Sequence, residues 1–545
     1  MQSINTTIQA LASARKSNAL ATHPNKEGAP SFYRGLKEQT IQVLTTGIMG
    51  DTFYASKEQL AQEAIAVLLK SVNEDPEFLA KALVYARNEG LLRSVPTLGL
   101  ALLSGRRDAK TLFESAFDKV ILIPDDLREF CSLCKSGKVP GRKGLGGMAR
   151  ESVRRWLGKL SEYHTVKYGS SASREITMRD ILRLTHPVPT DAASAERFGY
   201  LVRGKDGLSD NPLLNPQIRS LENLKLADST EEQVNLIRQG RLPFEVVIPS
   251  VKSMTPELWE ALLYSAPYRN LLNNLVTFTR HGVFAKEANV RYAVEKLTNR
   301  QAVEHSMVLP FRFFNAHRQY IALDQFDSRI ADGLHEAMEL SFVNMPTLGQ
   351  RVIAIGTDVS GSMDNVITSE SDTRYIDIAG IYTGALLRKV EDRVIALPFD
   401  TDVHLNHNLS GRDAILTTAH KIAGYHGGGT AVGAPIEYLL KRQLKVDVFI
   451  GITDNEDWAF GRGYSCSGGF LDLWRRYRKE VNRHCKAYLI TIAPYRDAVA
   501  PSGEQGIRYI YGWSDRVLKY IALDLENGSG QIQAIEAMNL ASEQS

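Results

Sequence analysis

The sequence predicts a chain of two parts, an all-α region followed by an α/β domain, and two patterns carry this prediction. Up to about residue 345, apolar residues recur at helical spacing in short blocks separated by Pro, Gly and Asp. From residue 351, Val- and Ile-rich runs alternate with helical stretches, which is typical of a parallel sheet covered on both faces. The change of pattern places the boundary at residues 345–350.

The first part consists of short helices with few β-branched runs between them. Clear helical blocks lie at 60–72, 76–90, 111–123, 256–266 and 290–299. Short helices in succession, without intervening strands, predict stacked antiparallel helix pairs, as in an α-solenoid.

The second part alternates strands with helices. Strands are predicted at 351–358, 393–400, 446–454 and 486–493, and helices at 373–392, 412–425, 432–443 and 470–485. We expect a flexible arm before this two-part body and a frayed tail after it. The predicted limits are 1–30, 31–348, 349–526 and 527–545.

Composition excludes several classes of protein. Of the 545 residues, 43% are hydrophobic and 23% charged, which excludes global disorder. No apolar run approaches the ~18–20 residues that a membrane-spanning helix needs. Four cysteines cannot form a disulfide framework, so we expect a reducing, cytoplasmic setting without membrane contact.

Charge is distributed unevenly along the chain. The 65 Lys and Arg nearly balance the 62 Asp and Glu, for a net charge of +3. Residues 138–186, however, contain eleven Lys and Arg against four acids, which is +7 and leaves −4 for all other residues. The whole net positive charge therefore lies in one stretch.

Within this stretch, the cations are placed where a phosphate backbone could meet them. Arg142 and Lys143 lie in a glycine-rich loop, and a helix with Arg150, Arg154 and Arg155 on one stripe follows. Such a loop and helix start offer phosphates both guanidinium and backbone N–H groups. Such a stripe is also typical of a solvated helix face, but the clustering favours binding.

A second basic segment, 178–186, follows. It contains Arg179 and ends on His186 before a proline. On its own, His186 is typical of a helix C-cap.

Three of the four predicted strands end in an aspartate, namely Asp358, Asp400 and Asp454. Ligands bind outside the carboxyl ends of the strands in an open parallel sheet. In the sequence Asp-Val-Ser-Gly-Ser, alternate residues Asp358, Ser360 and Ser362 can turn three oxygens toward one point. Carboxylates and hydroxyls suit a hard cation such as Mg²⁺.

Thr430 adds another hydroxyl after the glycine run 427–429, and Asp454 brings a second carboxylate from a neighbouring strand end. We expect Asp400 to shape this site without binding the metal. The alternative is that these Ser and Asp residues only cap helices.

Enzyme motifs are missing from the sequence. Ser360 and Ser362 do not lie in a Gly-x-Ser-x-Gly elbow, and the glycine run 427–429 lacks the lysine of a phosphate-binding loop. We therefore expect no catalytic activity.

The five oxygen-bearing residues, in this order, resemble the metal-ion-dependent adhesion site of von Willebrand factor A domains. The resemblance implies a divalent cation, Mg²⁺, and an open coordination position that a partner's carboxylate fills. The implied ligands are Asp358, Ser360, Ser362, Thr430 and Asp454.

Further strings look like the TROVE domain of Ro autoantigens and their bacterial orthologues, which bind small non-coding Y RNAs. In chain order these strings are Gly50–Tyr54, Lys167-Tyr168, Asp180–Pro187, Leu242–Glu245 and Leu309–Phe311, then Asp358–Met363, Gly427–Val432 and Phe449–Phe460 in the second part. The resemblance covers residues 30–525 and is collinear.

This resemblance implies a monomeric ring of HEAT-like helical repeats that an A domain closes. Y RNA stems bind the outer surface of such a ring, and single-stranded ends of misfolded RNAs enter its hole. Lys167, Arg174 and His186 stand where the family contacts Y RNA, although about two extra residues within 169–176 shift the register of Arg174. Asp457 departs from the Thr-like residue of the family. A bacterial member is expected to recruit an exoribonuclease, such as polynucleotide phosphorylase.

Three functions follow as hypotheses. The leading one is a non-catalytic RNA-binding scaffold for RNA quality control. The second is a metal-dependent protein-interaction module without an RNA role. The third, a subunit of a chelatase or ATPase machine, gains no support from the basic stretch.

Overall fold

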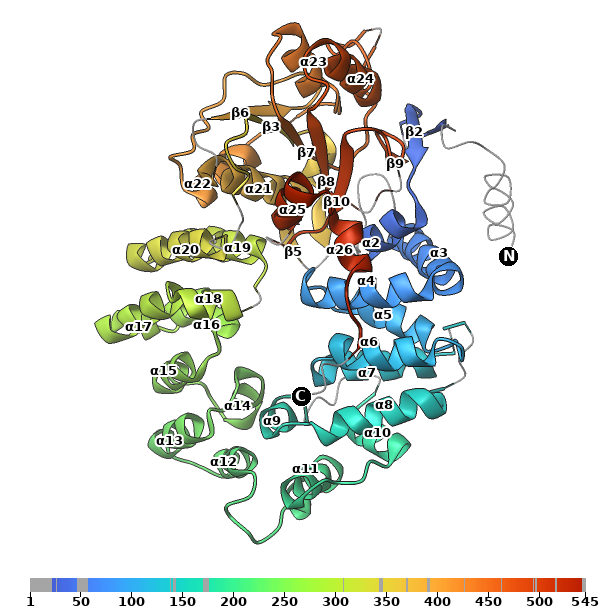
Figure 1. The fold of residues 1–545 in the computed structure, drawn as a ribbon. Helices are drawn as coiled ribbons and strands as arrows, with labels where there is room; N and C mark the ends of the chain where they lie inside the picture. The colour runs from blue at the N-terminus through green and yellow to red at the C-terminus, as the bar shows by residue number, and fades with distance from the viewer. Residues whose placement is uncertain are drawn as a thin grey trace. The chain divides into compact units, whose positions relative to one another are not determined.

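The computed structural model describes residues 22–541 except 26, 47–56, 138, 141–143, 170–175, 307, 343–346, 369–370, 390–392, 426, 462, 494, 496 and 515–516. The string at 50–54 lies outside these residues. The chain divides into two units (Figure 1). The helical unit comprises Leu68–Val343 with Ile535–Ser545, and the α/β unit comprises Met1–Val67 with Asn344–Ala534.

The helical unit is built from helices packed in two layers. They are α3 (Lys57–Glu74, which starts in the α/β unit), α4 (Pro76–Asn88), α5 (Ser94–Leu103), α6 (Lys110–Val120), α7 (Pro124–Lys135), α8 (Gly146–Gly158), α9 (Glu162–Gly169), α10 (Met178–Thr185), α11 (Ala192–Arg203), α12 (Pro216–Leu224), α13 (Thr230–Gly240), α14 (Phe244–Ser250), α15 (Pro256–Ser265), α16 (Tyr268–Arg280), α17 (Glu287–Leu297), α18 (Arg300–His305), α19 (Pro310–Ile321) and α20 (Ser328–Ser341). Many contact both their neighbour and the next helix along, as α4 contacts α5 and α6. The predicted stacked pairs are confirmed, and the five helical blocks are α3, α4, α6, α15 and α17.

Local sequence explains where several of these helices begin. The Asp75 side chain accepts a hydrogen bond from the Phe78 N–H, and Pro76 occupies the first helical position of α4. Thr177 and Asp180 form a capping box at the start of α10. These signals make the short helices begin at defined residues, while burial of their apolar faces stabilises them.

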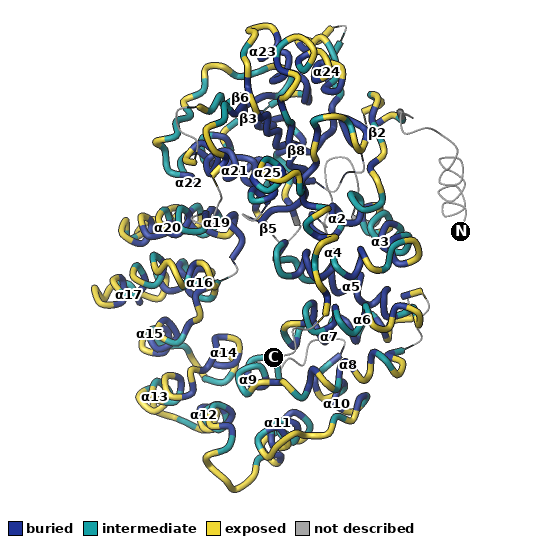
Figure 2. Tube along the Cα trace, in the orientation of Figure 1, coloured by how far each residue is buried: buried dark blue, intermediate teal, exposed yellow. Residues whose placement is uncertain are grey.

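The α/β unit contains a five-stranded parallel sheet with the order β10-β8-β7-β3-β6. Its strands are β3 (Ile353–Asp358), β6 (Val394–Phe399), β7 (Val448–Thr453), β8 (Lys486–Thr491) and β10 (Ile507–Tyr511). Every residue of β3 and β7 is buried (Figure 2). The four predicted strands are confirmed. The edge strand β10 was not predicted, because Arg508 interrupts its short apolar run.

Helices cover both faces of this sheet. They are α21 (Tyr375–Lys389), α22 (Ile415–Ala423), α23 (Ala434–Lys441), α24 (Phe470–Glu480) and α25 (Val517–Asn527). Adjacent residues of β3 contact opposite layers, because successive strand residues face opposite ways. Thr357 bonds to Thr383 of α21 through their hydroxyls (2.6 Å), whereas Gly356 lies against Pro435 of α23.

Residues near the N-terminus belong to the α/β unit, which differs from the predicted limit at residue 31. Strands β1 (Thr22–Pro24) and β2 (Pro30–Tyr33) extend β9 (Asp497–Ala498), and α2 (Leu36–Thr46) packs on β10. Gln42 of α2 donates hydrogen bonds to the carbonyls of Ala493 and Tyr495. These long-range bonds are the physical reason for the difference. The arm before residue 22 lies outside the described residues.

The predicted frayed tail is ordered as far as residue 541. Helix α26 (Gln531–Glu536) forms, and Ile535 is fully buried. Lys81 donates to the Glu536 carbonyl (2.8 Å), and Lys119 donates to the Leu540 carbonyl (3.1 Å). The tail therefore docks on the helical unit through its backbone carbonyls, which sequence patterns do not reveal. Within the described residues, every helix is too short or too polar to traverse a lipid bilayer.

Candidate functional site

The first candidate site lies at the carboxyl ends of β3 and β7. These strands are paired, so Asp358 at the end of β3 lies beside Thr453 and Asp454. Asp358 accepts hydrogen bonds from the Thr453 hydroxyl (2.6 Å) and from the Ser360 N–H (2.9 Å). The Ser360 and Ser362 hydroxyls are 3.2 Å apart. The structure thus brings four of the five predicted metal ligands together.

The fifth, Thr430, comes from the loop after the glycine run. The Gly361 N–H donates to the Gly428 carbonyl (3.0 Å), which joins this loop to the Asp-Val-Ser-Gly-Ser loop. A Cβ atom at Gly427 would lie 2.1 Å from the Val359 carbonyl oxygen, so only glycine permits this approach. Asp400 accepts from the Gly428 N–H (3.1 Å) and so holds the loop, in agreement with its expected shaping role.

The two carboxylates of this site are buried, and too few hydrogen bonds and no cation among the described residues compensate their negative charge. All five side chains are at most 2% exposed. Burial and the neighbouring charge of Asp454 raise the pKa of Asp358 to about 7, and burial also raises the pKa of Asp454. Asp454 Oδ2 is buried without a hydrogen-bond partner among the described residues. A buried carboxylate pair of this kind favours either a proton or a bound cation.

The residues therefore fit a hard cation. No three His, Cys, Asp or Glu side chains in the described parts of the chain are placed to hold a metal, so a cation here would need the three hydroxyls as well.

Asp457, the departure from the family pattern, has a structural role. Its carboxylate accepts hydrogen bonds from the Val432 and Phe470 N–H groups, both at 2.9 Å. Burial raises its pKa to about 7, and these two hydrogen bonds oppose the rise. Asp457 thus joins the start of α24 to the segment after Thr430.

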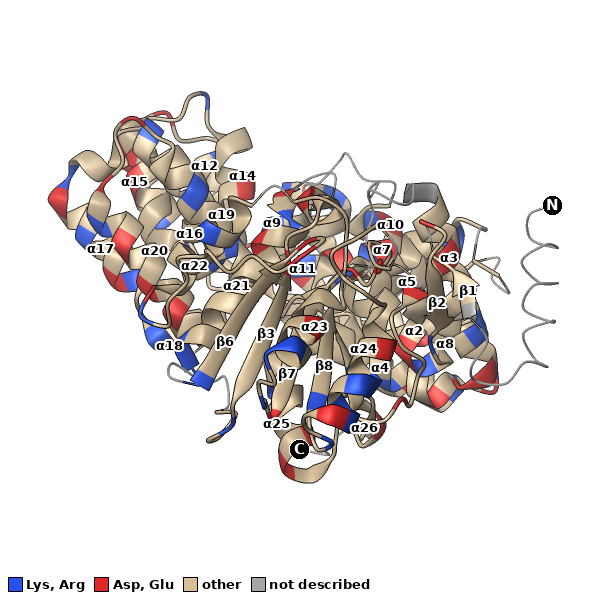
Figure 3. Ribbon diagram, turned by 90° about the horizontal axis from the view of Figure 1, so that it is seen from above, with Lys and Arg blue, Asp and Glu red and all other residues tan. Residues whose placement is uncertain are grey.

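The second candidate site is the predicted basic stretch, and Figure 3 colours the Lys and Arg of its described residues blue. Arg150, Arg179 and His186 are exposed. Arg154 of α8 donates to the Thr185 carbonyl (2.5 Å) at the end of α10, which brings it beside His186. Arg155 forms an ion pair with Asp118 (3.1 Å). The structure therefore joins the cations of α8 and α10 and partly neutralises Arg155.

Other predicted RNA contacts are less accessible or not described. Lys167 has a side chain only 16% exposed and forms an ion pair with Glu245 of α14 (3.0 Å). Although burial lowers its pKa, the hydrogen bond with Glu245 and two nearby tyrosines raise it, so Lys167 is charged. Arg142, Lys143 and Arg174 lie outside the described residues.

The helical unit also contains arginines that sequence reasoning missed, which we call the inner arginine group. Its members are Arg87, Arg93, Arg128, Arg269 and Arg312. Three of them pair with acids of α7: Arg87 and Arg93 with Asp126, and Arg128 with Asp125. Their positions range from residue 87 to 312, so no local pattern could have revealed the group.

The remaining two members, Arg269 and Arg312, reach solvent although neighbouring atoms surround much of each side chain, and they form no ion pair within the described residues. Burial and repulsion from Arg93 and Arg87 lower the pKa of Arg269, and burial and repulsion from Arg269 lower that of Arg312. Repelling cations without counter-charges are suited to binding an anion. A cavity of about 270 Å³ adjoins the group and is lined by Arg93, Asp125, Arg128, Glu129, Ser132, Leu133 and Ile176.

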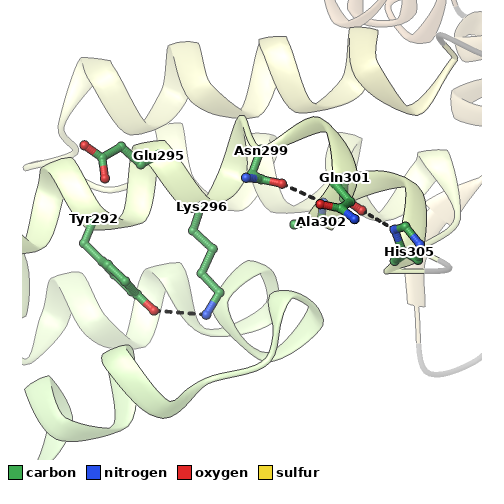
Figure 4. Close-up of a pocket in the computed structure, with 7 residues that line it drawn as sticks. All are labelled: Tyr292, Glu295, Lys296, Asn299, Gln301, Ala302 and His305. Carbon is green, nitrogen blue, oxygen red and sulfur yellow. Dashed lines mark hydrogen bonds between the residues drawn. The ribbon is translucent and has the colours of Figure 1, made fainter.

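A further cavity of about 550 Å³ lies along α17 and α18 (Figure 4). It is lined by Tyr292, Glu295, Lys296, Asn299, Gln301, Ala302 and His305. Lys296 donates to the Ala266 carbonyl (2.5 Å) and to the Tyr292 hydroxyl (3.1 Å). These bonds connect the end of α15 to α17, so the polar lining is used for helix packing, and no predicted site residue lies in it.

Comparison with known families decides what kind of protein this is. Residues 352–523 match the model of the Ro60 vWA domain, and residues 246–339 match that of the TROVE domain. The chain contains a TROVE domain and an A domain of the Ro60 type. The resemblances to an A domain and to the TROVE domain, and the predicted succession of a helical region and an A domain, are confirmed, whereas the metal site stays a prediction. The TROVE match begins within α14 and ends within α20, so the basic stretch precedes it.

Relatives of known name support this assignment. A Deinococcus radiodurans protein named RNA-binding protein RO60 is 26% identical over 442 residues, which cover 78% of this chain and 81% of the relative. A Caenorhabditis elegans protein of the same name is 24% identical over 482 residues, covering 75% and 72%. The crystal structure of the Deinococcus radiodurans RO (RSR) protein matches with a TM-score of 0.66 and 22% identity, over 90% of this chain and 99% of that one. This structural likeness shows a shared fold.

Proposed function

We propose that this Ro-type protein is the RNA-binding scaffold of a ribonucleoprotein and performs no chemistry itself. In this proposal, a small non-coding, Y-like RNA binds the basic surface of α8 and α10 through its stem. Single-stranded ends of misfolded RNAs bind the inner arginine group. The biological role is RNA quality control and processing in the cytoplasm.

The observation that carries the proposal is the inner arginine group. Five guanidinium groups lie near only two ion-pairing acids, and Arg269 and Arg312 repel their neighbours. Guanidinium groups bind phosphate oxygens through two parallel hydrogen bonds, so such a group suits an RNA backbone. Both relatives are named as RNA-binding proteins, which supports RNA as the ligand.

We extend the proposal to Mg²⁺ at the A-domain site. Asp358, Ser360, Ser362, Thr430 and Asp454 would hold the cation, whose charge would keep the buried carboxylates ionised. The five side chains are buried, which disfavours the alternative that a partner's carboxylate completes the site. We therefore propose that the cation stabilises the strand ends and the loop after the glycine run.

The proposed partners follow from the family resemblance. They are a Y-like RNA, misfolded or single-stranded RNA ends and, through the bound RNA, an exoribonuclease such as polynucleotide phosphorylase. The proposed working form is a monomeric ring.

Purification of the protein with its bound RNA tests the proposal. The double variant Arg150→Glu with Lys167→Glu is expected to lose co-purified RNA, because it reverses an exposed cation of α8 and the partly exposed cation of α9 that the family resemblance places at the Y RNA contact. The matched variant Glu245→Gln removes the acid that pairs with Lys167 and is expected to retain or increase bound RNA. Equal RNA content in the double variant and the parent would show that the assignment is wrong.

A further inference from the structure

A second concentration of positive charge lies in the A domain, and no prediction from the sequence included it. Residues 470–485 contain five Lys and Arg against two acids. Helix α23 packs beside α24, and the short segment 441–447 that follows contributes three more cations against one acid. We call these cations the α23–α24 patch. Its members are Lys441, Arg442, Lys445, Arg475, Arg476, Arg478, Lys479 and Arg483.

All but one of these side chains are exposed, Arg478 being intermediate. Three have acidic partners: Lys441 with Glu437, Arg475 with Glu504 and Arg476 with Glu480. Arg478 donates only to backbone carbonyls, those of Arg483 and Gln505. The others, Arg442, Lys445, Lys479 and Arg483, form no ion pair with a described residue. The patch therefore keeps most of its positive charge.

Helix dipoles explain only part of this pattern. The C-terminal ends of α23 and α24 favour cations, which accounts for Lys441, Arg478 and Lys479 in the last turns. Arg475 and Arg476 lie earlier in α24, and Lys445 and Arg483 lie beyond the helix ends. Helix dipoles therefore do not account for the whole set, which extends beyond the last turns of the two helices.

The geometry points to the backbone of double-stranded RNA as the ligand of the α23–α24 patch. None of the large hydrophobic side chains exposed in the described residues belongs to this surface, so it lacks the apolar centre typical of a protein interface. Phe470, Trp474 and Tyr477 are buried, so no ring from α24 is available to stack on single-stranded bases. Clustered guanidinium and ammonium groups without an aromatic platform suit phosphates alone.

The patch is separate from the proposed metal site. Lys445 precedes β7 and Arg483 precedes β8, so these cations lie at the amino edge of the sheet. Asp358 and Asp454 follow strands at the carboxyl edge. RNA binding by the patch is therefore independent of divalent cations, and it adds a contact surface to the one proposed for α8 and α10.

Binding of a blunt 20-base-pair RNA duplex to the full-length protein, measured over a range of salt concentrations, tests this inference. The patch variant combines Arg476→Glu, Lys479→Glu and Arg483→Glu. The matched control combines Lys205→Glu, Lys225→Glu and Lys252→Glu, which change the net charge equally at exposed positions of the helical unit. Thermal unfolding shows whether charge reversal impairs folding. If it does, a variant with Gln at the three patch positions replaces the patch variant in the binding experiment.

The patch variant is expected to bind the duplex at least tenfold more weakly than the control at 0.1 M salt. The slope of log K against log salt concentration should become shallower by about 2–3, since each lost phosphate contact removes about 0.9. EDTA should leave duplex binding unchanged. Equal losses of duplex affinity in the patch variant and the control, or an unchanged salt slope, would overturn the inference. An acidic protein would then be the partner to test. RNA co-purification of the Arg150→Glu, Lys167→Glu variant, scored in parallel, tests the proposed function separately.

Discussion

Asp358 is a buried residue whose charge affects the stability of the A domain. Its pKa is raised to about 7 by burial and by Asp454. Between about pH 4 and pH 7 the unfolded chain has released this proton while the folded chain still holds it. Metal-free protein therefore loses stability as the pH rises through this interval and levels off above it.

We expect Asp358→Asn to weaken this pH dependence, while the raised pKa values of Asp454 and Asp457 maintain a part of it. Without metal, the variant should melt at a higher temperature than the parent at pH 7.5, because a buried charge is gone. Mg²⁺ should raise the melting temperature of the parent more at pH 7.5 than at pH 5.5, since binding requires deprotonated carboxylates. The variant should respond to Mg²⁺ at neither pH. An equal Mg²⁺ response in both proteins would argue against the site.

Asp457 permits a second prediction at the residue scale. Replacement by Ala leaves the buried N–H groups of Val432 and Phe470 without their acceptor. We expect Asp457→Ala to lower the free energy of unfolding by about 2–4 kcal/mol, measured by urea denaturation. Asp457→Asn keeps one acceptor oxygen, so its free energy of unfolding should lie between those of Asp457→Ala and the parent. A loss below about 0.5 kcal/mol would show that the two bonds matter little.

At the scale of the elements, Asp126 joins α4, α5 and the start of α7. It is fully buried and accepts from Arg87 (3.0 Å), from Arg93 (2.9 Å) and from the Leu122 and Ile123 N–H groups. Asp126→Ala removes the ion-pair partner of the buried Arg87, which keeps only its hydrogen bond to the Val120 carbonyl, and leaves two N–H groups without their acceptor. The expected cost is about 3–5 kcal/mol of unfolding free energy.

A neighbouring acid provides the control for this prediction. Glu129 lies one turn further along α7, and burial raises its pKa. Glu129→Gln should cost far less than Asp126→Ala in the same denaturation experiment. Similar losses for the two variants would mean that the arginine contacts of Asp126 are not the source of stability.

At the scale of the whole molecule, the two RNA surfaces proposed for the helical unit should respond to different ligands. Arg269→Glu with Arg312→Glu is expected to weaken binding of a single-stranded oligonucleotide, with a salt slope shallower by about 0.7 per lost phosphate contact. Binding of a closed stem-loop should change less. Fluorescence anisotropy with the two labelled RNAs measures both effects. If the variant lost the same affinity for the stem-loop as for the single strand, the two RNAs would share one binding surface.

Prediction from the sequence succeeded where the deciding interactions are local. The four central strands and the helices between them follow from uninterrupted Val- and Ile-rich runs and from helical spacing. It was incomplete at the edge strand β10, where Arg508 breaks the apolar pattern, and at the chain ends. The hairpin of β1 and β2, and the tail to residue 541, are ordered by partners more than 400 positions away, such as Asp497 for His23 and Lys119 for Leu540.

The sequence by itself determined the two-part architecture and named the five oxygen-bearing residues, because strand ends and short loops place such groups predictably. Only the tertiary structure decided how these groups interact. It buried all five side chains, left Asp454 Oδ2 without a partner and paired Lys167 with Glu245. It also assembled the inner arginine group and the α23–α24 patch. Electrostatic energy depends on distance in space and on burial, and neither can be read from positions along a chain.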